Sequence, residues 1–177
     1  MNIPYIPNKK DPFFDKTTIC LLILLAIFLF FGVKSCKADI VSVAQAEIGH
    51  GEIGGNNRGV YVRQYLGGQE NLPWCAGFVS YCLKKDGYQL PYLLRVKSFL
   101  KYGNQVSQPK AGDLIVFTRQ GGGHIGIIEK VSANTITTIE GNLGNYPAKV
   151  KRVTYKKGQI KNLVGFVRLY AKLARGK

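Results

Sequence analysis

From residue 39 onward, the spacing of apolar positions changes once, near residue 110. Before that point, apolar side chains recur at helical intervals and predict helices over residues 39–48, 60–66, 73–86 and 90–102. After it, short apolar segments bounded by Gly, Asn and Lys predict strands over residues 114–118, 124–131, 135–141, 149–155 and 163–169. Helices followed by an antiparallel meander of about five to six strands predict an α+β domain.

The first 38 residues follow a different pattern. Residues 1–18 are polar and contain three prolines, which predicts a disordered cytoplasmic tip. Residues 19–33 carry no charge and are flanked by lysines, which predicts a transmembrane anchor or a signal segment. Residues 34–38 form a linker and residues 39–177 the folded domain. We expect an uncleaved anchor in the cytoplasmic membrane of a bacterial envelope, with the domain outside the cytoplasm; cleavage of the segment would give a secreted protein.

The predicted helix over residues 73–86 places Cys75 in its first turn. Pro73 suits the first helical position, and Gly87 suits the left-handed residue that ends a helix. Unpaired backbone N–H groups and the positive end of the helix dipole favour a thiolate there. The alternative is that Cys75 and Cys82 are both small core residues. Their spacing of seven puts them about 10 Å apart along a helix, too far for a disulfide.

A cysteine nucleophile needs a base and a group that orients the base. His124 begins a predicted strand after three glycines. If Val131 pairs with Thr135 across a three-residue turn, His124 lies opposite Asn142, and Glu140 lies diagonally on the same face. A two-residue turn would place these groups on opposite faces. The alternative interpretation of His124 is an ordinary histidine at the edge of a strand.

Four short motifs, taken in order, resemble the CHAP family of cysteine peptidases and amidases over about residues 39–170. They are Pro73-Trp74-Cys75-Ala76-Gly77-Phe78-Val79, Gly112-Asp113-Leu114-Ile115-Val116-Phe117, Gly123-His124-Ile125-Gly126-Ile127-Ile128 and Glu140-Gly141-Asn142. Gly77 stands where the family more usually has alanine. The resemblance implies a papain-like fold, with helices packed on an antiparallel sheet.

The resemblance also implies a function, namely cleavage of peptidoglycan. The bond would be the amide between muramic acid and L-alanine or one within the stem or cross-bridge peptides, cleaved through a thioester acyl-enzyme. Cys75 would be the nucleophile, His124 the base, Glu140 its orienting group and Asn142 a further polar member of the site. Two alternatives remain: a membrane-anchored wall-binding or assembly protein without turnover, and a papain-like peptidase that acts on proteins.

Further residues are candidates for substrate binding. His50, Glu52 and Asn57 lie in a Gly- and Asn-rich segment, residues 49–59, and could line a pocket; the alternative is a plain loop. Trp74 and Tyr61 could wall the cleft, with core packing as the alternative for Trp74. No cluster of metal ligands stands out, so neither zinc nor another cofactor is expected.

The charge is unevenly distributed. The formal net charge is +15, and no acidic residue follows Glu140. We therefore expect a basic C-terminal face that binds an anionic wall polymer or lipid, the alternative being a solvated surface without a partner. Nucleic acid is not expected, since no reader module accompanies the charge. The basic residues after Glu140 are Lys149, Lys151, Arg152, Lys156, Lys157, Lys161, Arg168, Lys172, Arg175 and Lys177.

Overall fold

Helices precede strands along residues 39–170, the part of the chain that this computed structural model describes, and all of these residues belong to one unit. The helical elements are α2 (Ile40–Ala46), α3 (Val60–Tyr65), α4 (Cys75–Lys85) and the 3-10 helix η1 (Val96–Lys101). The strands are β1 (Gly103–Val106), β2 (Leu114–Phe117), β3 (His124–Val131), β4 (Thr135–Leu143), β5 (Lys149–Lys156) and β6 (Leu163–Leu169).

The predicted tip, the apolar segment 19–33 and the linker lie outside the described residues. Among residues 39–170, no helix is both long and apolar enough to cross a membrane.

Local signals set the ends of the first and third helices. Asp39 caps α2: its carboxylate accepts a hydrogen bond from the backbone N–H of Ser42 at 2.8 Å, and the Ser42 hydroxyl accepts one from the Asp39 N–H at 3.1 Å. Helix α4 ends at Gly87, whose φ of 91° is left-handed. The N–H groups of Gly87 and Tyr88 bond back to the carbonyls of Lys84 and Leu83, which closes the helix as the sequence predicts.

The predicted helix over residues 90–102 is wrong in its first half. Only Val96–Lys101 is helical, as a 3-10 helix. The backbone of Leu93 bonds instead to the side chain of Ser80 on α4: its N–H donates at 2.9 Å and its carbonyl accepts at 2.7 Å. These two bonds hold the segment around Leu93 against α4. They take the place of the backbone hydrogen bonds that a helix would have made there.

The six strands form one antiparallel sheet in the order β1-β6-β2-β3-β4-β5. Strands β2 to β5 are the predicted meander, whereas β6 returns to pair with β2. Strand β1 was not predicted, because its sequence Gly-Asn-Gln-Val has no apolar alternation and it is fixed only by pairing with β6. The predicted α+β class, with helices packed on an antiparallel sheet, is confirmed.

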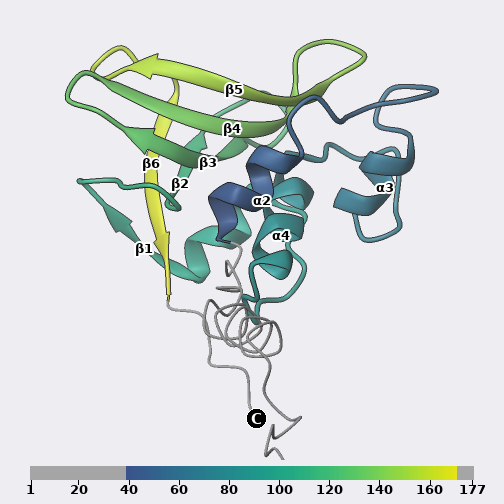
Figure 1. Cartoon of the computed structure of the whole chain (residues 1–177), viewed down its shortest axis with the longest axis horizontal. Helices are drawn as coiled ribbons and strands as arrows, with labels where there is room; N and C mark the ends of the chain where they lie inside the picture. The colour runs from purple at the N-terminus through teal and green to yellow at the C-terminus, as the bar shows by residue number, and fades with distance from the viewer. Residues whose placement is uncertain (1–38, 171–177) are drawn as a thin grey trace, which may run out of the picture. The chain divides into compact units, whose positions relative to one another are not determined.

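Both faces of the sheet are apolar, but only one is covered by helices. Helices α2 and α4 pack on β3 and β4 (Figure 1). The main core lies between them and includes Phe78, Ile125, Ile127 and Ile139. A smaller cluster on the other face contains Ile115, Phe117, Ile128 and Ile136. Alternation along β3 therefore places His124 and Gly126 on the face of Ile128, away from the main core, with His124 at the very start of the strand.

The register of the β3–β4 hairpin differs from the prediction at two places, and the two differences cancel. Val131 pairs with Ile136 and not with Thr135, and the Ser132 N–H bonds to the Thr135 carbonyl. The turn therefore has two residues where three were predicted. Farther along, Ile127 pairs with Ile139, which requires one extra residue in β3, and the register shifts between Ile128 and Lys130. This β-bulge at Glu129 restores the parity that places His124 and Glu140 on one face.

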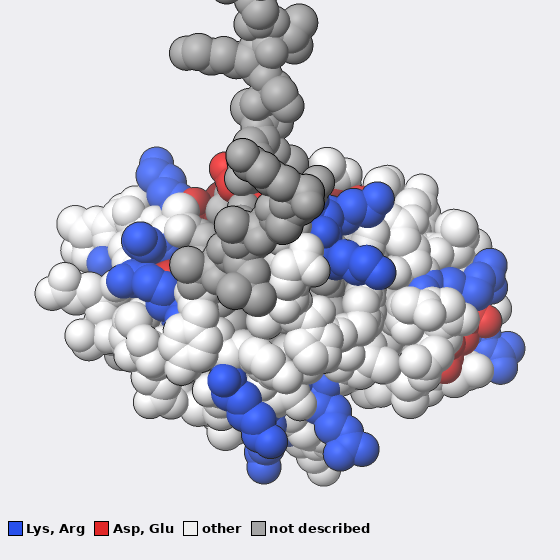
Figure 2. All heavy atoms as spheres, turned by 90° about the horizontal axis from the view of Figure 1, so that it is seen from below, with Lys and Arg blue, Asp and Glu red and all other residues white. Residues whose placement is uncertain are grey.

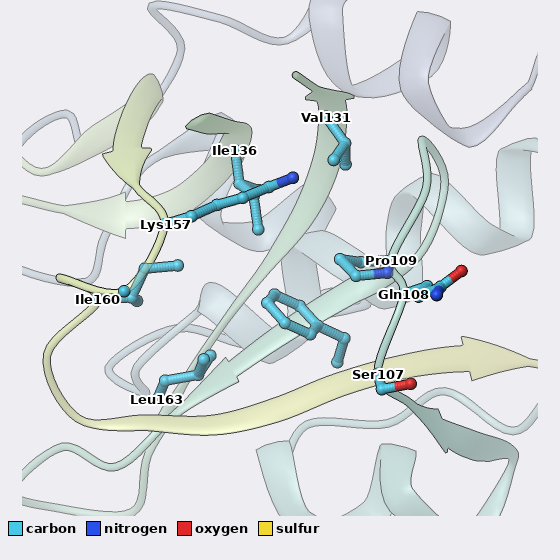
Figure 3. Close-up of a pocket in the computed structure, with 10 residues that line it drawn as sticks. Ser107, Gln108, Pro109, Val131, Ile136, Lys157, Ile160 and Leu163 are labelled. Carbon is cyan, nitrogen blue, oxygen red and sulfur yellow. The ribbon is translucent and has the colours of Figure 1, made fainter. Parts of the chain in front are cut away.

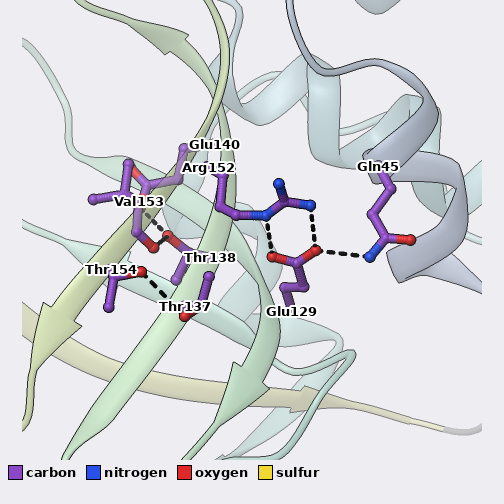
Figure 4. A network of polar contacts seen from close by, with 8 residues as sticks. All are labelled: Gln45, Glu129, Thr137, Thr138, Glu140, Arg152, Val153 and Thr154. Atoms are coloured by element: carbon purple, nitrogen blue, oxygen red, sulfur yellow. Dashed lines mark hydrogen bonds and ion pairs between the residues drawn. The ribbon is translucent and has the colours of Figure 1, made fainter.

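The side chain of the bulged residue Glu129 is held from two sides (Figure 4). Arg152 on β5 donates to its carboxylate from Nε at 2.5 Å and from Nη2 at 2.7 Å, and Gln45 of α2 donates from Nε2 at 2.7 Å. The bidentate pair fixes the direction of the carboxylate. The bulge is therefore tied both to the neighbouring strand and to the helical layer.

The basic C-terminal region is partly neutralised by acids from earlier strands. Arg152 pairs with Glu129, and Arg168 pairs with Asp113 at the start of β2. In Figure 2, lysine and arginine side chains form several separate groups on the face shown, with uncharged surface between them. Lys172, Arg175 and Lys177 lie outside the described residues. Binding of a membrane or an anionic polymer by these residues stays a prediction.

Candidate active site

Cys75 is the first residue of helix α4. Trp74 is the N-cap and its carbonyl accepts from the Phe78 N–H at 2.8 Å, so the N–H of Cys75 belongs to the first turn, which has no partners inside the helix. The Cys75 thiol is free and its residue is 5% exposed. The helix thus presents the sulfur at its electropositive end, as predicted. The predicted start at Pro73 is wrong, because Pro73 precedes the N-cap and the helix begins two residues later.

His124 and Glu140 meet as the strand parity requires. Nε2 of His124 lies 2.8 Å from Oε2 of Glu140, with both side chains buried. Gly126 makes room for this contact, since a Cβ at that position would lie 2.5 Å from Cγ of Glu140. The hydrogen bond occupies Nε2, so the ring presents its other nitrogen, Nδ1, to the rest of the site.

Glu140 is fully buried, and two further residues satisfy its carboxylate. The Thr138 hydroxyl donates to Oε1 at 2.5 Å and the Tyr155 hydroxyl donates to the same oxygen at 2.9 Å. Burial alone would raise the pKa of Glu140, but the bonds from His124, Thr138 and Tyr155 outweigh it and lower that pKa. Glu140 is therefore an oriented carboxylate anion at neutral pH.

Thr138 and Tyr155 were missed in the sequence. Thr138 stands two residues before Glu140 in β4 and so shares its face, a signal that strand alternation alone could have supplied. Tyr155 comes from β5, and its ring lies 5.5 Å from that of Phe117, which in turn lies 6.0 Å from the His124 ring. The contact of Tyr155 with Glu140 depends on the pairing of β4 with β5, which the sequence does not reveal.

The imidazole of His124 interacts with both Cys75 and Glu140. Burial lowers its pKa, but the neighbouring side chains of Cys75 and Glu140 outweigh that effect and raise the pKa from 6.5 to about 9. Nδ1 makes no hydrogen bond with any residue in the described part of the chain, although it is buried. The nitrogen that is not bonded to Glu140 is thus left to exchange a proton with the thiol.

A cleft of about 600 Å³ opens beside Cys75. Its walls come from the segment before α4, from the start of η1 and from the loop before β3, and are formed by Leu72, Pro73, Cys75, Ala76, Leu94, Arg95, Val96, Lys97, Gly121, Gly122 and Gly123. The triple glycine was noted in the sequence, but residues 94–97 were not recognised as part of the site. A cavity of this size is in the range of ligand pockets.

A second cavity, of about 520 Å³, lies on the sheet face that the helices leave open (Figure 3). Its walls are mainly apolar, among them Val131, Ile136 and Phe166, and its one charged residue is Lys157. Neither a cysteine, a histidine nor a carboxylate lines it. The cleft beside Cys75 is therefore the candidate active site.

The structure corrects the prediction that Trp74 and Glu52 line the cleft. Trp74 is completely buried and stacks on Tyr65 at 5.4 Å between ring centroids. Glu52 is 5% exposed, and its carboxylate accepts from the N–H of Asn57 at 2.8 Å, from Ala148 at 2.7 Å and from Trp74 Nε1 at 3.4 Å. A buried carboxylate with three internal donors ties segments together and has little capacity left for substrate.

Asn57 and Tyr61 are also not among the residues that line the Cys75 cleft. Asn57 is a half-buried turn residue with φ of 54°, bonded through its backbone to Glu52. Tyr61 stacks on His50 at 4.0 Å, and His50 bonds to Glu47 at 3.0 Å. These contacts join Tyr61 of α3 to the segment that follows α2, and none of them is made with His124.

Asn142 follows Glu140 in β4 with a left-handed φ of 58° and is half-buried. Its side chain makes no hydrogen bond with another residue among 39–170, and it is not part of the cleft wall. Its role as a polar member of the site stays a prediction.

Cys82 is the second free thiol of the described chain and differs from Cys75 in its surroundings. It is completely buried, and burial, together with the charge of Glu47, raises the pKa of its thiol well above the ordinary value. Such a thiol is a poor nucleophile. Among residues 39–170, no group of three His, Cys, Asp or Glu side chains is placed to hold a metal ion.

Comparison with known proteins adds a family to this geometry. Residues 67–142 match the CHAP domain, and this segment contains Cys75, His124, Glu140 and Asn142. The match supports a peptidoglycan hydrolase family for this part of the chain. No curated protein sequence matches the chain.

Two solved structures are similar to the chain at low sequence identity. One is a Staphylococcus aureus subsp. aureus Mu50 protein described as similar to a lipoprotein of the NLP/P60 family, with 16% identity, a TM-score of 0.47 and coverage of 93% of this chain and 46% of that chain. The other is Ly7917, with 15% identity, a TM-score of 0.43 and coverage of 76% of this chain and 63% of that chain. This chain therefore spans less than two thirds of the length of each.

Proposed function

We propose that this chain, which carries a CHAP domain, is a peptidoglycan hydrolase that cleaves an amide bond with Cys75 as its nucleophile. One observation carries the proposal. A buried imidazole is fixed by an anionic carboxylate at Nε2, leaves Nδ1 unpartnered and interacts with a cysteine at a helix N-terminus beside a cleft. This is the nucleophile, base and orienting group that amide hydrolysis by a thiol requires.

In the proposed reaction, the Cys75 thiolate, paired with the protonated His124, attacks the carbonyl carbon of a wall-peptide amide. The oxyanion that forms is stabilised by N–H groups in the first turn of α4, including that of Cys75. His124 gives its proton to the amine as the C–N bond breaks, which leaves a thioester on Cys75. His124 then takes a proton from water and the hydroxide attacks the thioester. The C–S bond breaks to give a carboxylic acid and the Cys75 thiolate beside the protonated His124.

The test is the release of soluble fragments from purified peptidoglycan. The Cys75→Ala variant loses its nucleophile, so we expect its activity to fall to background. Cys82→Ala is the matched control, because it removes the other thiol of the described domain from a site in the core, and it should keep the activity. Fragment release by Cys75→Ala at the wild-type rate would disprove the proposal.

The bond that is cut is the finer part of the proposal. An N-acetylmuramoyl-L-alanine amidase frees an intact stem peptide with a new N-terminal alanine, whereas an endopeptidase cuts within the stem or cross-bridge. Mass spectrometry of the digested wall separates these products. Digestion of an unrelated protein such as casein at a comparable rate would instead favour a papain-like peptidase acting on proteins.

The competing function is a membrane-anchored wall-binding or assembly protein without turnover. The complete set of Cys75, His124 and Glu140 favours the enzyme. Iodoacetamide at neutral pH distinguishes the two, since a reactive nucleophile alkylates much faster than the buried Cys82. Equal, slow labelling of both thiols would favour the binding protein.

We also propose that the domain works in the bacterial cell envelope, attached through residues 19–33. The support is the uncharged apolar run between flanking lysines, which lies outside the described residues. Fractionation of cells that make the full chain tests this proposal. Recovery in the membrane fraction is the expected result, and a soluble protein in the medium would indicate that the segment is cleaved.

A further inference from the structure

The cleft beside Cys75 is positively charged. Its two charged residues are Arg95 and Lys97, and no acidic side chain lines it. Both are exposed, and neither side chain makes an ion pair or hydrogen bond with another residue in the described range 39–170. Elsewhere in that range, Arg63, Arg152 and Arg168 pair with carboxylates. The charge of Arg95 and Lys97 is thus uncompensated beside the candidate nucleophile.

The fold holds these two side chains at the cleft. Val96, which separates them, is buried, and its Cβ would lie 3.5 Å from a Cβ built on Gly123 of the opposite wall. Val96 therefore anchors the start of η1 against the loop before His124. Because Val96 points inward, its exposed neighbours on either side are left at the rim.

The opposite wall is bare backbone. Gly121, Gly122 and Gly123 have left-handed φ values of 91°, 127° and 99°, and no atom lies within 4 Å of a Cβ built on Gly121 or Gly122. Side chains are absent from this part of the wall, so the main chain of an extended ligand can approach closely. A cleft with one cationic rim and one glycine wall suits a peptide that carries a negative charge on one side.

We infer that Arg95 and Lys97 bind a free carboxylate of the substrate close to the amide that Cys75 attacks. This inference rests on the proposed function and adds a specificity to it: the preferred wall peptide is one whose acidic groups are free, not amidated. A guanidinium recognises a carboxylate in a bidentate manner, and a charged hydrogen bond is about twice as strong as a neutral one. A carboxamide in the same place retains the shape but loses the charge.

The experiment compares two preparations of the same peptidoglycan, one untreated and one whose carboxylates have been converted to carboxamides with carbodiimide and ammonia. We expect wild type to show a kcat/KM about 10-fold or more higher for the untreated wall, since hydrogen bonds to a charged carboxylate are stronger than those to a neutral carboxamide. The double variant Arg95→Gln, Lys97→Gln should cleave both preparations at nearly the rate that wild type reaches on amidated wall. Lys101→Gln is the control, because Lys101 is exposed on the same helix η1 but does not line the cleft.

The outcomes separate the two proposals. Equal cleavage of both preparations by wild type overturns the carboxylate specificity and leaves the hydrolase in place. If neither preparation is cleaved, the proposed function fails, and protection of Cys75 from iodoacetamide then decides the binding inference. Stronger protection by soluble stem peptides with free carboxylates than by their amidated forms supports it, and equal protection overturns it.

Discussion

At the scale of single residues, Glu140 orients the His124 ring and, together with Cys75, raises the pKa of His124. It is fully buried, yet its three donors keep it ionised, and it holds the His124 ring through Nε2. The ring can then act only through Nδ1, toward Cys75. The negative charge of Glu140 also helps to keep the imidazolium protonated up to a pH of about 9.

The Glu140→Gln variant tests this dependence. Replacing the anion by a neutral amide removes a stabilising charge, so the pKa of His124 should fall from about 9 toward its ordinary value. In the proposed reaction, His124 must carry a proton to release the amine, so the alkaline limb of the pH profile of kcat/KM should move to lower pH. We also expect a loss of activity on the order of 100-fold, because the base is no longer held by an anion. Fragment release from peptidoglycan, measured between pH 6 and 10, gives this profile.

Glu70→Gln is the control for this measurement. Glu70 is an acid that pairs with Arg63 on α3 and not with His124. Its loss should leave the alkaline limb in place. An unshifted limb in Glu140→Gln would refute the role assigned to the Glu140 charge.

At the scale of elements, the sequence predicts several bounds of strands and helices, because the periodicity of apolar residues and the glycines at helix ends determine them. The strands over residues 124–131 and 163–169 have the predicted bounds, and Gly87 ends α4 as expected. Periodicity does not determine the register of the β3–β4 hairpin. The turn is shorter than predicted, and the parity of His124 and Glu140 is preserved only by the bulge at Glu129. That bulge depends on Arg152 and Gln45, which are distant in sequence.

The packing of α4 against α3 explains why position 77 is a glycine, which the sequence alone does not explain. A Cβ on Gly77 would lie 2.5 Å from the carbonyl oxygen of Tyr65 and 3.0 Å from Cδ2 of Leu66, at the end of α3. The alanine more usual at this position in CHAP domains would push α3 away from α4. Glycine therefore permits the close packing of these two helices.

The Gly77→Ala variant should be destabilised in spite of the higher helix propensity of alanine. The overlap is with backbone, which cannot rotate away, so we expect a loss of about 1–3 kcal/mol in the free energy of unfolding. Urea denaturation followed by circular dichroism measures this change. A variant as stable as wild type or more stable would show that α3 moves freely, and the packing argument would then fail.

At the scale of the whole domain, the site joins segments that are distant in the sequence. Cys75 comes from a helix and His124 from a strand, whereas the cleft walls come from residues 94–97 and 121–123. Sequence motifs predicted the first two, because their chemistry restricts the residue types. The walls were missed because Arg95 and Lys97 are ordinary surface residues until the fold places them beside a thiol.

The interaction of His124 with Cys75 and Glu140 should also make the stability of the whole domain depend on pH. The pKa of His124 is raised in the folded state to about 9 from an ordinary 6.5, so between these values the folded protein binds more protons than the unfolded chain. The stabilisation is fully present below pH 6.5 and is lost as pH rises through 9. At 1.36 kcal/mol per pKa unit, it is at most about 3 kcal/mol.

Urea denaturation of wild type at pH 6.5 and pH 9.5 should therefore show a fall in the free energy of unfolding. The same comparison in His124→Gln removes the titrating group, so its fall should be smaller by the contribution of His124. The tyrosines that contribute at higher pH, such as Tyr155, whose pKa burial and Glu140 raise, are retained in both proteins and cancel in the difference. An identical fall in both would show that His124 gains no proton affinity on folding, contrary to its placement between Cys75 and Glu140.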